Sequence, residues 1–172
     1  MALRKIVRYP DPKLREISEP VEDPTAPEVK QLVDDMAETM YAANGAGLAA
    51  IQVGIPLRLF IVDAAIAGGT EDDPVLTFIN PEIAWLGDEK ETGDEGCLSF
   101  PGIFVPITRS FRARIRAMNL DGEQFEMEGD GLLARAFQHE TDHLDAKLLA
   151  DYVGRIKRQL IERRLLKEQA QE

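Results

Sequence analysis

The stretch Gln138–His143 restricts the fold of this chain more than any other. It reads Gln-His-Glu-Thr-Asp-His and contains both histidines of the protein, His139 and His143, with Glu140 directly after the first. On an α-helix, residues four positions apart lie on one face, one turn above the other. Two imidazoles placed in this way can bind one metal ion, and a carboxylate beside them can move protons. The pattern therefore predicts a helix that forms part of a metal site, to which the fold must bring a third ligand.

The single cysteine, Cys97, is the candidate for that third ligand. One thiolate and two imidazoles leave one position open for water, which is the arrangement of catalytic rather than structural metal sites. Two alternatives stay open on the residues alone: oxygen ligands at the metal, and Cys97 as a small buried hydrophobic residue. Gly96 and the polar neighbours Glu95 and Ser99 favour a turn or sheet edge with a functional role.

The charge of the chain argues against a general role in binding DNA or other nucleic acids. The 172 residues carry a formal net charge of −11, whereas nucleic-acid-binding domains are usually basic. Arg155–Lys167 is the exception, because six Lys or Arg stand against one Glu there, a local net charge of +5. No apolar run approaches the roughly 20 residues that span a bilayer, and one cysteine permits no internal disulfide. We expect one cytoplasmic domain, residues 1–172, with no membrane partner.

Hydrophobic periodicity predicts both helices and strands. Helices are expected over about 28–43, from Asp130 through the histidine segment, and over about 152–168. Strands are expected over 57–63, 75–86, 111–117 and 124–128, and the acidic segment 89–95 is expected to be exposed. The last helix would be basic and amphipathic. Its apolar stripe would consist of Val153, Ile156, Leu160, Ile161 and Leu165.

The turn that contains Gly122 predicts a specific strand register. A two-residue loop would place Arg116 opposite an apolar residue. A three-residue loop, 120–122, with Gly122 in the left-handed conformation, instead pairs Arg116 with Glu126 and Arg114 with Glu128. We therefore expect the longer loop, with these arginines facing solvent and pairing across the strands.

Three segments together resemble the signature motifs of the peptide deformylase family. They are Gly45–Gln52 (Gly-Ala-Gly-Leu-Ala-Ala-Ile-Gln), Glu95–Ser99 (Glu-Gly-Cys-Leu-Ser) and Gln138–Leu144 (Gln-His-Glu-Thr-Asp-His-Leu), and they occur in the family's order. Further matches are Tyr9–Pro12, Asn80–Ile83 and Asp130–Arg135. The resemblance implies an α+β fold in which antiparallel β-sheets surround a central metal-binding helix, with an N-terminal helix and a C-terminal helix.

The resemblance also implies an activity. Members of the family are metal-dependent hydrolases that remove the N-formyl group from the initiator N-formylmethionine of nascent polypeptides and release formate. By position, Cys97, His139 and His143 would hold one Fe(2+) ion per chain, replaceable by Zn(2+), Ni(2+) or Co(2+).

Roles in catalysis and substrate binding follow from the same resemblance. Glu140 would act as general base and then as general acid, while Gln52 and the backbone N–H of Leu98 would stabilise the oxyanion. The implied substrate-binding residues are Ala46, Gly47, Leu48, Leu132 and Ala136.

Three positions depart from the family pattern. Ala46 and Ile51 stand where a larger β-branched residue and a proline are common, and Ala146 stands where glycine is usual. If position 146 needs a left-handed backbone, alanine costs about 1–2 kcal/mol. These departures affect pocket shape and helix geometry rather than the reaction.

The basic last helix has two interpretations. It is either an amphipathic helix with a solvated charged face, or a contact to the ribosome near the peptide exit tunnel, since related enzymes of similar layout use a C-terminal helix in this way. Two other readings of the whole chain are a zinc endopeptidase, which shares the His-Glu-x-x-His element, and a non-catalytic metal-binding or ribosome-associated protein. Cys97 argues against the endopeptidase, and the full set of catalytic groups argues against the non-catalytic protein.

Overall fold

The chain folds into an α+β arrangement, as expected. The computed structural model describes residues 2–172. The α-helices in that range are α1 (Pro27–Ala42), α2 (Gly131–Leu144) and α3 (Arg155–Ala170). The strands are β1 (Gly47–Ala49), β2 (Leu59–Val62), β3 (Leu76–Leu86), β4 (Lys90–Glu95), β5 (Val105–Ser110), β6 (Arg112–Met118) and β7 (Gln124–Asp130). The short 3-10 helices are η1 (Pro12–Arg15), η2 (Ala50–Val53), η3 (Ala64–Ala67) and η4 (Leu149–Tyr152).

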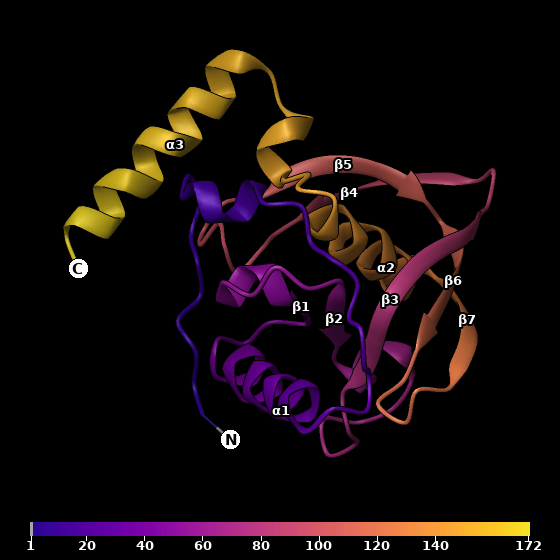
Figure 1. Ribbon diagram of the computed structural model, residues 1–172. Coiled ribbons are helices and arrows are strands. Elements are labelled where there is room, and N and C mark those ends of the chain that lie inside the picture. The colour runs from indigo at the N-terminus through magenta and orange to yellow at the C-terminus, as the bar shows by residue number, and fades with distance from the viewer. Residues whose placement is uncertain (1) are drawn as a thin grey trace.

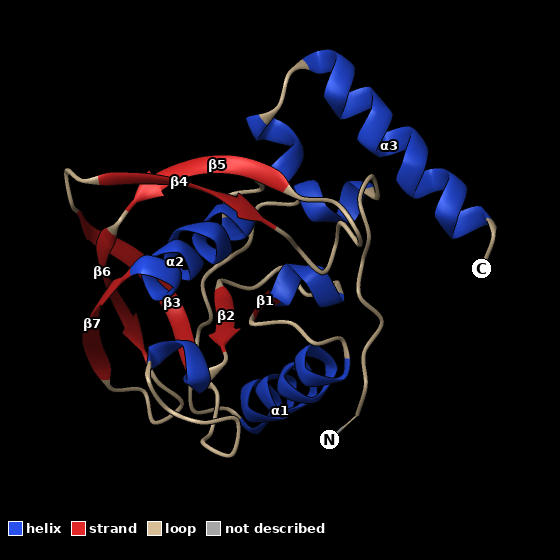
Figure 2. Cartoon of the chain, turned by 180° about the vertical axis from the view of Figure 1, so that it is seen from behind, coloured by secondary structure: helices blue, strands red, loops and turns tan. Residues whose placement is uncertain are grey.

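Two antiparallel sheets enclose helix α2. The larger sheet has the order β1-β2-β3-β6-β7, and the smaller consists of β4 and β5. Helix α2 contacts all strands of the larger sheet and also β5, so it lies between the two sheets (Figures 1 and 2). This confirms the expected central helix surrounded by antiparallel strands. The enclosure supplies the buried surroundings that a helix of this composition needs, because α2 carries apolar residues on one broad side.

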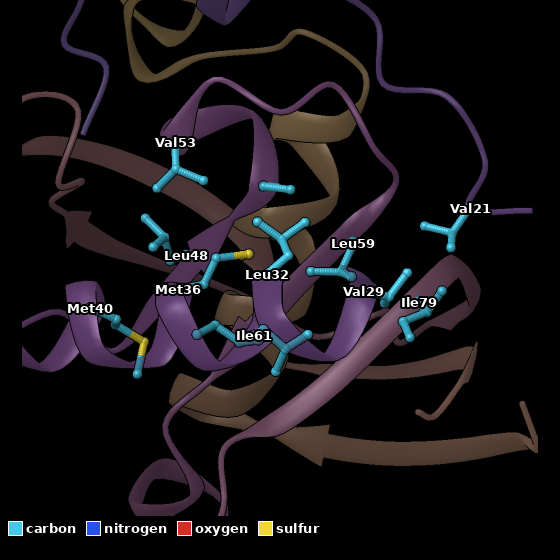
Figure 3. Close-up of a cluster of buried hydrophobic side chains, with 12 residues drawn as sticks. Val21, Val29, Leu32, Met36, Met40, Leu48, Val53, Leu59, Ile61 and Ile79 are labelled. Carbon is cyan, nitrogen blue, oxygen red and sulfur yellow. The ribbon is translucent and has the colours of Figure 1, made fainter. Parts of the chain in front are cut away.

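Helix α1 forms one side of the hydrophobic core. Its buried Val29, Leu32, Met36 and Met40 recur at helical spacing and pack against β1 and β2. Figure 3 shows these side chains around Leu59 and the other core residues of the sheet. A second apolar cluster lies between α2 and the larger sheet, and a third lies beneath α3. The first cluster holds β1 in place, and β1 in turn lies beside the functional site described below.

The β6–β7 hairpin has the predicted register. Arg116 pairs with Glu126 and Arg114 with Glu128, and Gly122 has a φ of +79°. Both arginines form exposed ion pairs with these partners. Pairs of this kind contribute little to stability, so the alternation of apolar residues on the other face sets the register.

Three expectations need correction. Residues 89–95 are not simply exposed: most of them form β4, and its last residue, Glu95, is buried. The last helix begins at Arg155 rather than near Tyr152, because η4 and an extended Gly154 precede it. Only part of its predicted apolar stripe is buried, since Ile156 and Leu160 are 76% and 56% exposed. The buried residues of α3 are Ile161 and Leu165.

The backbone at Ala146 is strained. Ala146, just after α2, has a φ of +60°, so this position does take the left-handed conformation, with alanine in place of the usual glycine. It carries a strain of about 1–2 kcal/mol that glycine would not.

In residues 2–172, none of the helices combines the length and apolar character needed to span a bilayer.

Candidate metal centre and active site

Helix α2 places both histidines on its inward face. His139 and His143 are 9% and 2% exposed, and their ring centroids lie 5.0 Å apart. The four-residue spacing puts the rings one turn apart, as predicted. Because both sheets cover this part of α2, the two imidazoles point into protein rather than into solvent.

Cys97 reaches the histidines from the smaller sheet. It follows β4 by two residues, and its Sγ lies 3.4 Å from His143 Nε2. One ligand atom from each of Cys97, His139 and His143 lies within 4.8 Å of the others. The structure therefore brings the three proposed ligands together, from two segments that are more than forty residues apart in the sequence.

Glu95 orients the ring of His139. Its Oε1 lies 2.8 Å from His139 Nδ1, which leaves the Nε2 atom of His139 free to bind a metal ion. Arg109 donates to both carboxylate oxygens of Glu95 at 2.8 Å, and Arg135 Nη1 donates to Oε2 at 2.6 Å. Although burial by itself raises the pKa of Glu95, the hydrogen bonds from Arg109 and His139 outweigh it and hold that pKa well below its usual value. A carboxylate–histidine pair of this kind fixes the ring and the tautomer of a metal ligand.

The arginine also ties this pair to the end of α2. Arg109 Nη1 donates to Asp142 Oδ2 at 2.7 Å and to the Tyr152 hydroxyl at 3.0 Å. The Tyr152 hydroxyl donates to the same Asp142 oxygen at 2.5 Å. Glu95, Arg109, Asp142 and Tyr152 thus connect β4, β5, α2 and η4 in one polar network. We refer to these four residues as the Arg109 network.

The sequence offered few signals for these supporting residues. Arg135 lies four residues before His139 on α2, so helical spacing indicated that the two share a face. Glu95 is the first residue of the Glu95–Ser99 motif, directly before Gly96-Cys97. Arg109 and Tyr152 have no such signal, because their partners are distant in the sequence and meet only in the folded chain.

Glu140 lies beside the three ligands in a buried position. Its Oε2 is 3.9 Å from His139 Nε2, and its buried Oε1 has no hydrogen-bond partner among residues 2–172. Burial raises the pKa of this carboxyl to about 7. Gly47 of β1 makes room for it, since a Cβ there would lie 2.8 Å from Glu140 Oε2. A carboxyl with a pKa near neutrality can both accept and donate a proton.

The two histidines differ in their electrostatic surroundings. Burial by itself lowers the pKa of His139, but the charge of Glu140 and hydrogen bonds with Cys97 and Glu95 outweigh it and raise that pKa well above its usual value. Burial, together with the positive charges of His139 and Arg109, lowers the pKa of His143 well below its usual value. Surroundings that favour a proton on His139 also favour a metal cation at the same place. His143 is neutral, as a histidine must be to bind a metal ion.

These residues fit a metal ion. One thiolate and two imidazoles suit iron, zinc and nickel, and the buried, unpartnered oxygen of Glu140 lies next to them. Three protein ligands leave a coordination position free for water or substrate. The arrangement can therefore support metal-assisted hydrolysis.

A cavity of about 510 Å³ leads to this group. Its lining includes Gln52, Leu98 and four of the five predicted substrate-binding residues, Ala46, Gly47, Leu132 and Ala136. The fifth, Leu48, is fully buried in the core beneath α1, so its side chain does not reach the cavity.

Gln52 is buried at the inner end of the cavity. Its Oε1 accepts from Ala49 N at 3.0 Å, which orients the amide. Its Nε2 donates to Ser99 Oγ at 3.0 Å and lies 3.3 Å from Cys97 Sγ. The side-chain amide therefore faces the sulfur of Cys97.

Comparisons with known proteins agree with this geometry. Residues 3–159 match the family model described as polypeptide deformylase. The peptide deformylase of Bartonella tribocorum is 50% identical over 169 residues, covering 97% of this chain and 93% of that protein. A crystal structure of a peptide deformylase from Legionella pneumophila is 38% identical, with a TM-score of 0.90 and 99% of both chains covered. One from Ehrlichia chaffeensis is 35% identical, with a TM-score of 0.91, 99% of this chain and 98% of that chain covered. The chain therefore belongs to the peptide deformylase family, whose members are hydrolases acting on amides.

Proposed function

We propose that this chain removes the N-formyl group from the initiator N-formylmethionine of nascent polypeptides and releases formate. The observation that carries the proposal is the buried Glu140 carboxyl beside the Cys97, His139 and His143 group, where all but His143 line a cavity of about 510 Å³. Family membership supplies the substrate class. The formyl carbon carries only hydrogen on one side, so the site needs to hold peptide on one side of the scissile bond.

We further propose that Cys97, His139 and His143 hold one Fe(2+) ion, which Zn(2+), Ni(2+) or Co(2+) can replace. When bound, the ion would supply a Lewis acid that lowers the pKa of water and polarises the formyl carbonyl. The soft thiolate and the two imidazoles support this choice of metals.

Glu140 is the proposed proton carrier. As general base, its free Oε1 accepts the proton of the attacking water, so that hydroxide adds to the formyl carbon. When the carbon–nitrogen bond breaks, the same carboxyl returns the proton to the leaving nitrogen, which becomes the free amine of methionine. The pKa of about 7 supports both roles, because neither protonation state is then strongly favoured at neutral pH.

Gln52 and Leu98 are the proposed oxyanion donors. The Nε2 of Gln52 already faces Cys97, and the backbone N–H of Leu98 has no backbone partner in residues 2–172. Two donors aimed at the developing negative charge stabilise the tetrahedral species more than the flat formyl group.

Two free strand edges support the proposed mode of substrate binding. β1 is an edge strand of the larger sheet, and β4 has a partner on one side, β5. Residues of both strands line the cavity, so an extended peptide can pair with the backbone around Gly47. Ala46, Leu132 and Ala136 would contact its side chains, while Leu48 would contribute backbone.

Formate release provides the test. We expect anaerobically purified, Fe(2+)- or Ni(2+)-loaded protein to release formate from a short formyl-Met peptide and to leave the unformylated peptide intact. Cleavage of an internal peptide bond without a formyl group would instead support the endopeptidase reading. Turnover of neither peptide would support the non-catalytic reading. An Ehrlichia chaffeensis deformylase has been crystallised with actinonin, so we expect actinonin to inhibit formate release here.

The partner and location that we propose follow from the same function. Residues 1–172 would act as one domain in the cytoplasm, where nascent chains emerge. α3 would contact ribosomal RNA near the exit tunnel through exposed basic residues such as Lys157, Arg163 and Lys167. Because Ile161 and Leu165 are buried, charge reversal of these three residues tests the contact better than deletion of the helix. We expect the reversal to abolish salt-sensitive ribosome binding and to leave short-peptide turnover unchanged.

A further inference from the structure

A second groove, of about 850 Å³, lies next to the active-site cavity. One wall is the N-terminal segment Leu3–Arg8, which we call the strap, and the end of α3 adds Gln169. The floor includes Thr39, Ala42 and Val53. In Figure 1 the strap runs in indigo along the outside of the body, from the end of α1 towards η1 beside α3. Apart from Leu98, none of its lining residues has a catalytic role proposed above.

The groove and the cavity share part of their lining. Ala43, Leu98 and Pro101 belong to both. The side chain of Leu98 packs against Gly45, where a Cβ would lie 2.6 Å from Leu98 Cδ1. Leu98 therefore belongs to the lining of both hollows, and a side chain at position 45 would displace it.

Both walls of the cavity lead from the proposed metal ligands into the lining that the cavity shares with the groove. One wall runs from Gly47, beside Glu140, back to Ala43, and the other runs from Cys97 to Pro101. Four residues span at most about 14 Å. Because Ala43 and Pro101 line both hollows, an extended peptide with its formyl end at Glu140 therefore needs at most about four residues to reach the shared lining, and the residues that follow can enter the groove.

The strap has backbone groups free to receive a peptide. Arg4 N donates to Thr39 Oγ1 and Val7 N donates to the carbonyl of Gln52, so these two N–H groups hold the strap on the body. The N–H groups of Lys5 and Ile6, between them, have no hydrogen-bond partner in the described part of the chain. A segment anchored in this way can accept an added strand.

The charges of the groove do not select a charged ligand. Arg4 is paired with Asp35 and Arg8 with Glu172, so two of its cations are already compensated. Lys5 and Asp11 also line it and carry opposite charges. The groove combines these with Ala42, Val53 and unpaired backbone N–H groups, which suits an extended peptide without a net charge.

Another hollow adjoins the cavity but fits less well. It shares one lining residue, Ile66, with the cavity. The groove shares three residues with the cavity and has the free backbone edge, so it is the better continuation.

We propose that the groove binds the residues of the formylated polypeptide that follow about the fourth position, as an extended strand along the strap. This inference rests on the proposed function, because it places the same substrate in a longer site. It predicts that the enzyme binds residues of the nascent chain beyond the first few.

Peptide length tests the proposal. The substrates are a formyl-Met tripeptide and a nonapeptide that begins with the same three residues and continues with alternating Val and Ser. We expect kcat/KM for the nonapeptide to exceed that for the tripeptide about tenfold, through a lower KM. Ala42, exposed at the end of α1, lines the groove and not the cavity, so Ala42→Trp should reduce this ratio to about one. Ala65→Trp, at an exposed alanine outside both hollows, should keep the wild-type ratio.

A crosslinking measurement locates the peptide directly. A photoreactive residue at position six of the nonapeptide should label the strap. Labelling of η3 or β7 instead would overturn the proposal, as would a length ratio near one in the wild-type protein. If even the tripeptide releases no formate, the proposed function itself fails, which distinguishes the two outcomes.

Discussion

Helices α2 and α3 are similar in length but opposite in what surrounds them. α2 has eight buried residues, including both histidines and Glu140, whereas α3 has two, Ile161 and Leu165. α2 lies between two sheets, while α3 extends along one side of the body (Figure 1). Its remaining large apolar residues, such as Ile156, face solvent.

The difference shows which interactions give a residue a specific role. On α2, the side chains of His139, Glu140 and His143 are buried, so the fold sets their surroundings and their pKa values. On α3, charged side chains stay solvated, and single exposed charges contribute little to stability. The same substitution, made once on α2 and once on α3, should therefore have very different effects.

The largest contrast is expected for Glu-to-Gln substitutions. Glu140→Gln removes the proposed proton acceptor and should lower kcat about 10³-fold. Bound metal, measured by elemental analysis, should be unchanged, because Glu140 is not among the proposed ligand residues. Glu162→Gln on α3 is the matched control and should leave kcat unaltered. Substantial activity of the Glu140 variant would exclude this residue as the base.

The second contrast concerns stability and pH in the metal-free protein. Because burial raises the pKa of Glu140 to about 7, its protonated form is favoured in the folded state. Its stabilising contribution is present below the ordinary glutamate pKa and is lost as the pH rises through about 7. Glutamine resembles the protonated acid, so metal-free Glu140→Gln should be more stable than metal-free wild type by about 3 kcal/mol near pH 8.

Thermal melting at several pH values checks this sign. The advantage of the variant should shrink towards pH 5, where wild-type Glu140 is itself protonated when folded. An advantage that is equal at both pH values would show that charge burial is not its cause.

The third prediction tests whether the Arg109 network contributes to metal affinity by orienting His139. Glu95→Gln weakens the hydrogen bond that orients His139 and leaves Arg109 facing a neutral group, so metal affinity should fall about 10–100-fold. Competition with a chelator measures this affinity without reference to turnover. Glu91→Gln, at an exposed position on the same strand, should not change it. Equal affinities for the two variants would restrict Glu95 to a structural role.

The smallest effects should occur on α3 itself. Leu165 is fully buried against the third core cluster, so Leu165→Ala should cost about 2 kcal/mol of unfolding free energy. Leu160, which is 56% exposed, should cost less than about 0.5 kcal/mol on the same change. Denaturant titration of both variants gives the comparison. Similar losses would mean that α3 has an apolar partner on its outer face.

Much of α2 and its surroundings could be predicted from the sequence, because local rules determine them. The spacing of His139 and His143 already placed both on one helical face, and alternation with the turn at Gly122 determined the register of β6 and β7. These signals are short-range, so they survive without knowledge of the fold.

The errors have a common physical origin. β4 was missed because Lys90–Glu95 contains no apolar alternation; its pairing with β5 and the ion pairs of Glu95 hold it instead. The apolar residues of α3 suggested a buried stripe, but burial depends on what packs against the helix. Arg109 could not be identified for the same reason, since its partners come from three other elements.

The open edges of β1 and β4 also bear on how the protein behaves at high concentration. An unpaired strand edge can recruit the edge of another molecule and start aggregation. β1 is three residues long and lies at the wall of a cavity, and β4 presents exposed Lys90, Glu91 and Asp94. Shortness and charge are the usual protections against edge-to-edge pairing. The molecule can thus keep two strand edges open while discouraging its own copies from pairing with them.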